Sequence, residues 1–84
     1  MKLIISPAAA KALGRMPRKD AQSLLAKLKQ VAEAPAALYP WATRLADHPG
    51  FRVRHGDWRA IYRLDWDRGE MIVVKVAKRG EVYR

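Results

Sequence analysis

Residues 51–77 read as three strands separated by two short turns. Strands are predicted over Phe51–His55, Trp58–Asp65 and Met71–Ala77, because apolar residues recur there at every second position or, in the last segment, fill both faces. The glycines of His55-Gly56-Asp57 and Arg68-Gly69 mark the turns between them. Strands joined by turns this short must run antiparallel, so the chain is constrained to contain a three-stranded meander.

The first part of the chain adds one strand and two helices. Leu3–Ile5 is a short apolar run typical of a strand. Ser6-Pro7 then starts a helix over Ala8–Met16, because a serine hydroxyl can cap free N–H groups and proline lacks the N–H that would go unpaired. A second helix is predicted over Arg18–Glu33, where apolar residues follow the spacing of a buried helical stripe.

These elements predict a single α+β domain spanning residues 1–84, in the order strand, helix, helix, strand, strand, strand. A chain of this length has room for one modest core. The expected architecture is a largely antiparallel four-stranded sheet with the two helices packed as a hairpin on one face. Ala34–Pro49, which contains three prolines, is expected to connect the second helix to the sheet.

The charge balance favours a polyanionic partner. Seventeen Lys and Arg against eight Asp and Glu leave a net charge of +9, which attracts nucleic acid, an acidic membrane surface or an acidic protein segment. The absence of cysteine excludes disulfide scaffolds, thiolate zinc sites and cysteine nucleophiles. His48 and His55 have no carboxylate cluster around them, so no metal or other cofactor is expected. No apolar run is long enough for a signal peptide or a membrane span, and a cytoplasmic location without membrane association is therefore expected.

One face of the predicted meander carries guanidinium groups in place of core residues. Arg52 and Arg54 alternate with apolar residues, and Arg59 falls on one face of the next strand. If the strand register places these three arginines on the same side, the sheet presents a cationic surface that weakens folding by self-repulsion, so a binding site explains it better than a structural role. Guanidinium forks match phosphate oxygens and stack on bases, which makes an RNA phosphate the first ligand to consider. Trp58 and Tyr62 alternate with the arginines and are expected to point into the core.

Two motifs resemble the RelE/ParE superfamily of bacterial toxins from type II toxin–antitoxin pairs. The first is Phe51-Arg52-Val53-Arg54-His55-Gly56-Asp57-Trp58-Arg59-Ala60-Ile61-Tyr62-Arg63, which follows the pattern aromatic-Arg-x-Arg-x-Gly-x-aromatic-Arg-x-x-Tyr. The second is Val76-Ala77-Lys78-Arg79-Gly80-Glu81-Val82-Tyr83, which looks like the C-terminal basic residue, acidic residue and tyrosine of the family. The resemblance covers nearly the whole chain and implies a RelE-like fold.

The resemblance, closest to the RelE branch, also implies an activity and partners. Toxins of that branch are mRNA interferases: metal-independent endoribonucleases that cleave mRNA in the ribosomal A site and so inhibit translation. Cleavage proceeds by attack of the 2′-hydroxyl on the scissile phosphate. A small acidic antitoxin from a neighbouring gene is the implied protein partner, and it binds and blocks the toxin.

Site residues carry over from the family position by position. Arg59 and Arg79 match the arginines that hold the scissile phosphate, and Tyr83 matches the tyrosine that stacks on the nucleotide or helps activate the 2′-hydroxyl. Arg52 and Arg54 stand where the best-studied members carry lysines, one of them proposed to transfer a proton. Lys78 looks like the basic RNA-binding residue that precedes the C-terminal arginine.

The arginines at positions 52 and 54 leave the chemistry open, because arginine stays protonated and is a poor proton-transfer group. Tyr83 or His55 can be the base, although a turn histidine is more often merely solvated. The site can instead rely on electrostatics and on positioning by the ribosome. Two functions without cleavage also remain: a ParE-like inhibitor of DNA gyrase, and an inert member that only binds its antitoxin.

Overall fold

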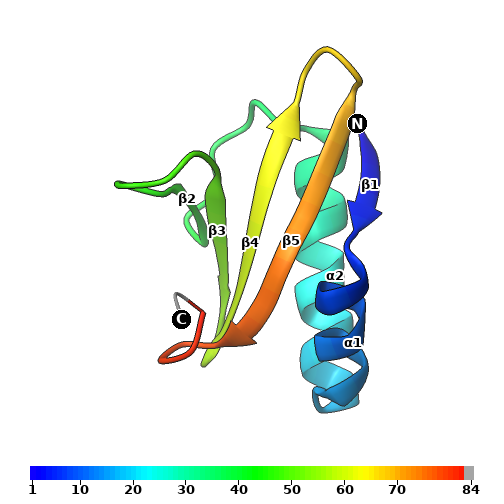
Figure 1. Ribbon diagram of the computed structural model, residues 1–84, viewed down its shortest axis with the longest axis vertical. Coiled ribbons are helices and arrows are strands. Elements are labelled where there is room, and N and C mark those ends of the chain that lie inside the picture. Colours follow the sequence, from blue (N-terminus) through cyan, green and yellow to red (C-terminus); the bar gives the residue numbers. More distant parts are fainter. Residues whose placement is uncertain (83–84) are drawn as a thin grey trace.

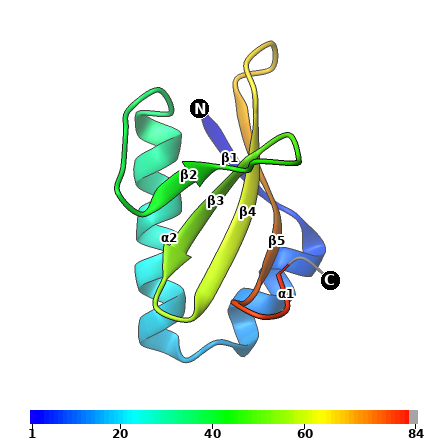
Figure 2. The same ribbon diagram turned by 90° about the vertical axis from the view of Figure 1, so that its left-hand side faces the viewer.

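A five-stranded sheet carries two helices on one of its faces (Figures 1 and 2). The computed structural model describes residues 1–82 of the chain. In chain order the elements are β1 (Lys2–Ile5), α1 (Pro7–Arg15), α2 (Arg18–Glu33), β2 (Ala42–Arg44), β3 (Phe51–His55), β4 (Trp58–Asp65) and β5 (Glu70–Lys78). None of the helices in this described part has the length and apolarity needed to cross a membrane.

The sheet has the strand order β1-β5-β4-β3-β2. Antiparallel pairing of β3 with β4 and of β4 with β5 confirms the predicted meander, and β1 lies parallel to β5 at the far edge. The prediction of four strands was wrong, because residues of the connecting segment form β2 and pair antiparallel with β3. The N–H of Arg54 donates to the carbonyl of Trp41 at 2.8 Å, and the N–H of Leu45 donates to that of Gly50 at 3.0 Å. Three residues between prolines are too few to show a strand period, so only this pairing reveals the strand.

The helix starts follow the local sequence closely. The Ser6 hydroxyl accepts a hydrogen bond from the Ala9 N–H at 3.1 Å, and Pro7 occupies the first turn of α1. The apolar stripe of α2 supplies the fully buried Leu24, Leu28 and Val31. The two helices therefore form at their predicted positions, with α1 displaced by one residue.

The core fills the space between the helices and the inner face of the sheet. Its sheet side consists of Val53, Ala60, Tyr62, Met71, Val73 and Val76. Tyr62 is 3% exposed and stacks on Phe51, with ring centroids 5.1 Å apart. Trp58 packs against the same core, so both aromatic residues of β4 point inward as predicted.

A bulge in β5 decides which of its residues face outward. Ile61 pairs with Lys75, but the next residue, Tyr62, pairs with Val73, so Val74 is an extra residue on β5. The bulge reverses the alternation and places Lys75 opposite Ile61 on the outer face, which is the face of the sheet away from the helices. Without it, Lys75 would fall on the core side in phase with Met71 and Val73.

Candidate functional site

Three arginines gather on the outer face at one end of the sheet. Arg54 lies directly opposite Arg59 across β3 and β4, Arg52 pairs with Ile61, and Arg59 pairs with Ala77. Because alternate residues of a strand point to opposite faces, this register places Arg52, Arg54 and Arg59 on the same side. The condition for a cationic surface is therefore met.

A fourth arginine joins them from the turn that follows β5. The N–H of Arg79 donates to the carbonyl of Asp57 at 2.7 Å, which ties this turn to the one between β3 and β4 (red and yellow-green at the lower end of Figure 1). The N–H groups of Glu81 and Val82 donate to the carbonyl of Lys78 at 2.9 and 3.1 Å. Arg52, Arg54, Arg59 and Arg79 are called the arginine cluster below.

The four positive charges act on one another. Partial burial lowers the pKa of Arg59, and the charges of Arg52, Arg79 and Arg54 lower it further, whereas Asp57 offsets part of this effect. Like charges at this range destabilise the folded state unless an anion lies among them. The arginine cluster therefore has the electrostatic character of an anion site.

Backbone carbonyls orient two of these guanidinium groups. Nη1 of Arg59 donates to the carbonyls of Gly56 and Trp58 at 2.7 and 2.9 Å. Nη2 of Arg54 donates to the carbonyl of Pro40 at 3.1 Å. These bonds fix each guanidinium group to a neighbouring turn or loop. A guanidinium has five N–H donors, so each group can also bind the oxygens of a ligand.

Two of the predicted site residues are not placed in this cluster. The Lys78 ammonium lies 5.7 Å from the centroid of the Trp58 ring, on the side of the sheet to which Trp58 points. Tyr83 lies outside the described residues. Its neighbour Val82 is 2% exposed and is not part of the core under the helices.

His55 faces the helices and not the arginine cluster. Its Nε2 lies 3.2 Å from Oδ1 of Asp20, and its Nδ1 lies 3.5 Å from the Lys27 ammonium. Lys27 also donates to the carbonyl of Arg54 at 3.0 Å, so these side chains link α2 to the end of β3. The expectation of a merely solvated turn histidine was wrong, since His55 ends a strand and is partly buried.

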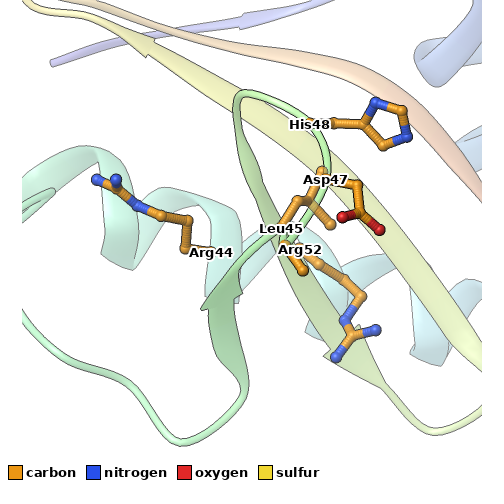
Figure 3. A pocket seen from close by; sticks show the side chains of 6 residues that line it. Arg44, Leu45, Asp47, His48 and Arg52 are labelled. Atoms are coloured by element: carbon orange, nitrogen blue, oxygen red, sulfur yellow. The ribbon is translucent and has the colours of Figure 1, made fainter.

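The other histidine, considered from the sequence only as a metal ligand, lies over the outer face instead. The loop between β2 and β3 encloses a hollow of about 450 Å³, shown in Figure 3 and called the loop hollow. It is lined by Arg44, Leu45, Ala46, Asp47, His48 and Arg52. In Figure 3 the Asp47 carboxylate lies between the imidazole of His48 and the guanidinium of Arg52. The sequence spacing does not predict that His48 lies over this face, because its position depends on how the loop folds.

His48 also lines a second, more apolar hollow, called the His48 pocket. It has a volume of about 240 Å³ and is lined by Leu45, His48, Pro49, Ile61, Val74, Lys75 and Val82. Ile61 and Lys75 are the outward-facing pair beside the bulge. The His48 pocket therefore lies on the outer face. The buried Val82, which belongs to the C-terminal segment, forms one of its walls.

Several solved structures share this fold. The archaeal RelE–RelB complex from Pyrococcus horikoshii OT3 matches with a TM-score of 0.78 and 22% identity, over 96% of this chain and 97% of that chain. The intact RelBE complex from E. coli matches with a TM-score of 0.78 and 20% identity, over 92% and 94%. A YoeB/ParE toxin from Agrobacterium tumefaciens gives 0.77 and 14%, over 93% and 98%.

These likenesses confirm the RelE-like fold. No curated protein matches the sequence. The family described as "ParE toxin of type II toxin-antitoxin system, parDE" matches residues 3–83. Since that match spans nearly the entire sequence, the chain belongs to the ParE toxin family and is a toxin of a type II toxin–antitoxin system in the RelE/ParE superfamily.

Proposed function

We propose that this toxin is an mRNA interferase, a metal-independent endoribonuclease that cleaves mRNA in the ribosomal A site and so inhibits translation. The observation that carries the proposal is the arginine cluster on the outer face, in which the charges of Arg52, Arg79 and Arg54 lower the pKa of Arg59. A phosphate among these side chains would relieve their mutual repulsion. Guanidinium forks can offer paired donors to its non-bridging oxygens.

The reaction that suits this site is a transesterification. The 2′-hydroxyl attacks the adjacent phosphorus, and the developing phosphorane carries extra negative charge on its equatorial oxygens. Arg59 and Arg79 are the proposed ligands of these oxygens, supported by Arg52 and Arg54. Fixed positive charge that meets charge developing in the transition state is the largest catalytic term in many enzymes.

The proposed protein partner is a small acidic antitoxin. The P. horikoshii and E. coli relatives were solved as complexes with RelB. The net charge of +9 makes this toxin attractive to an acidic segment. Such a partner would cover the arginine cluster and exclude RNA from it.

A second candidate function is inhibition of DNA gyrase, which is favoured by the description of the matching family as ParE. This function requires binding and no cleavage. The arginine cluster alone does not separate the two candidate functions. One target, mRNA, is a polyanion and the other, DNA gyrase, binds a polyanion, so a cationic surface suits both.

One experiment separates them. The toxin is expressed from an inducible promoter in bacteria, mRNA 5′ ends are mapped, and gyrase supercoiling is assayed with the purified protein. We expect codon-phased cuts in translated messages and unchanged supercoiling. Intact mRNA with inhibited supercoiling would establish the gyrase inhibitor, and intact mRNA with normal supercoiling and growth would indicate an inert antitoxin-binding protein.

A matched pair of substitutions locates the activity. Arg79→Ala removes a member of the arginine cluster and should relieve growth arrest by reducing cleavage at least tenfold. Arg68→Ala removes the same charge from the exposed turn between β4 and β5, at the opposite end of the sheet (Figure 1), and should leave growth arrest unchanged. Equal relief by both variants would mean that net charge matters and the cluster does not.

A further inference from the structure

The proposed cleavage needs a group that accepts the proton of the 2′-hydroxyl, and the arginine cluster does not contain one. Arginine stays protonated at any physiological pH. His55 is held on the helix side by Asp20 and Lys27. Tyr83, the other base considered from the sequence, lies outside the described residues. The proton acceptor inferred below is one of the described residues, and its role rests on the proposed endoribonuclease function.

His48 is the histidine on the outer face. It lines the loop hollow and the His48 pocket, and so lies where the two meet. In Figure 3 its imidazole extends from the loop toward the neighbouring strands, away from Arg44. Histidine side chains gain and lose a proton near neutral pH, which suits them to general acid–base catalysis.

Arg52 belongs to the arginine cluster and lines the loop hollow together with His48. In Figure 3 the Asp47 carboxylate lies between the two side chains. Arg52 is also the charge that acts most strongly on Arg59. A phosphate held by Arg52 and Arg59 would therefore lie beside the loop hollow. The sugar that carries this phosphate would then enter the hollow next to His48.

The His48 pocket offers apolar walls against which a nucleoside can pack. Leu45, Ile61, Val74 and Val82 provide apolar surface. The charged groups that line the two hollows around the imidazole are Arg44 from β2, Asp47 from the loop, Arg52 from β3 and Lys75 from β5. Apolar walls with a few polar groups are typical of sites that orient a small ring system.

We propose that His48 is the general base of the cleavage reaction. The neutral imidazole takes the proton of the 2′-hydroxyl while the 2′-oxygen forms its bond to phosphorus. The bond from phosphorus to the 5′-oxygen breaks, and the leaving oxygen takes a proton from water. The products are a 2′,3′-cyclic phosphate and a 5′-hydroxyl end, and the imidazolium returns its proton to solvent.

The test is the pH dependence of single-turnover cleavage on programmed ribosomes, with His48→Gln as the variant and His55→Gln as its matched control. Glutamine is polar and of similar size, but its amide does not accept a proton at physiological pH. His48→Gln should lower the rate about 100-fold, within the range typical of a lost general base. It should also abolish the rise of the rate with pH that a single general base produces. His55→Gln should keep the rate within about twofold and retain that rise.

A second variant guards against an indirect effect on folding. His48→Ala should be rescued at least fivefold by free imidazole, whereas Arg79→Ala should not be rescued. If the wild type cleaves and His48→Gln keeps its rate and its pH profile, His48 is not the base and the proposed function still stands. If the wild type does not cleave programmed mRNA at all, the proposed function fails and this inference fails with it.

Discussion

Arg59 illustrates how one residue can keep its charge at some cost to the fold. Burial is the largest cause of its lowered pKa, followed by the charges of Arg52, Arg79 and Arg54. A guanidinium nevertheless remains protonated throughout the physiological range. The repulsion therefore persists at neutral pH, and a bound anion is the natural means of relieving it.

Tyr62 should contribute to the loss of stability at high pH. Burial raises its pKa to about 12, with a smaller contribution from Tyr39. Because this exceeds the ordinary value of about 10, the stability it contributes is complete below about pH 10 and is lost as the pH rises toward 12. Tyr62→Phe cannot ionise, so the difference in unfolding free energy between the two proteins should shift by about 2 kcal/mol between about pH 9 and 12. Urea unfolding across this range measures it, and parallel curves would show that the pKa of Tyr62 is the same in the folded and the unfolded protein.

At the scale of elements, short connections decide where the outer-face side chains lie. Gly50 ends the loop that carries His48, and its N-terminal neighbour along that loop is Pro49. Its φ of +120° lies in the region that favours glycine, and an added Cβ would lie 2.9 Å from the carbonyl oxygen of Tyr62. The loop therefore approaches β4 closely only because residue 50 has no side chain.

A pair of glycine substitutions tests this close approach. Gly50→Ala should lower the free energy of unfolding by about 1–3 kcal/mol, because the methyl group strains the backbone and meets the Tyr62 carbonyl. Gly14→Ala makes the same change in α1, where nothing lies within 4 Å of the added Cβ, and should raise it by about 0.5–1 kcal/mol through helix propensity. Thermal and urea unfolding measure both changes. A loss of stability in both variants would contradict the assignment of strain to residue 50.

At the scale of the whole molecule, positive charge is concentrated toward one end of the sheet. The arginine cluster lies at the end where β3 turns into β4, whereas Asp65, Asp67 and Glu70 lie at the other end, around the turn between β4 and β5. The net charge of +9 brings polyanions to the surface, and this distribution orients them toward the cluster.

The salt dependence of RNA binding should report this distribution. Each phosphate contact on a single strand adds about 0.7 to the slope of log affinity against log salt. Arg79→Gln should lower the slope for an uncleavable 2′-deoxy oligonucleotide by roughly this amount, and Arg68→Gln should leave it unchanged. Fluorescence anisotropy at several salt concentrations measures both slopes. An equal reduction in the two variants would indicate binding by net charge alone.

Local sequence determined much of this protein. The Ser6-Pro7 helix start, the apolar stripe of α2 and the turns at Gly56 and Gly69 predicted both helices and the meander, because each signal depends on neighbours in the chain. The alternation of β3 and β4 also predicted that arginines and core aromatic residues lie on opposite faces, since the strand period is two.

Tertiary structure decided the remaining features. The strand β2, the parallel pairing of β1 with β5 and the bulge at Val74 arise from contacts between distant segments, which a local period cannot encode. The two histidines show the consequence for the site. His55 lies within the arginine motif in sequence but faces α2, whereas His48 lies outside the motif and lines both hollows on the outer face. Alternation along β3 turns the first away from the site, and the fold of the loop that ends at Gly50 brings the second toward it.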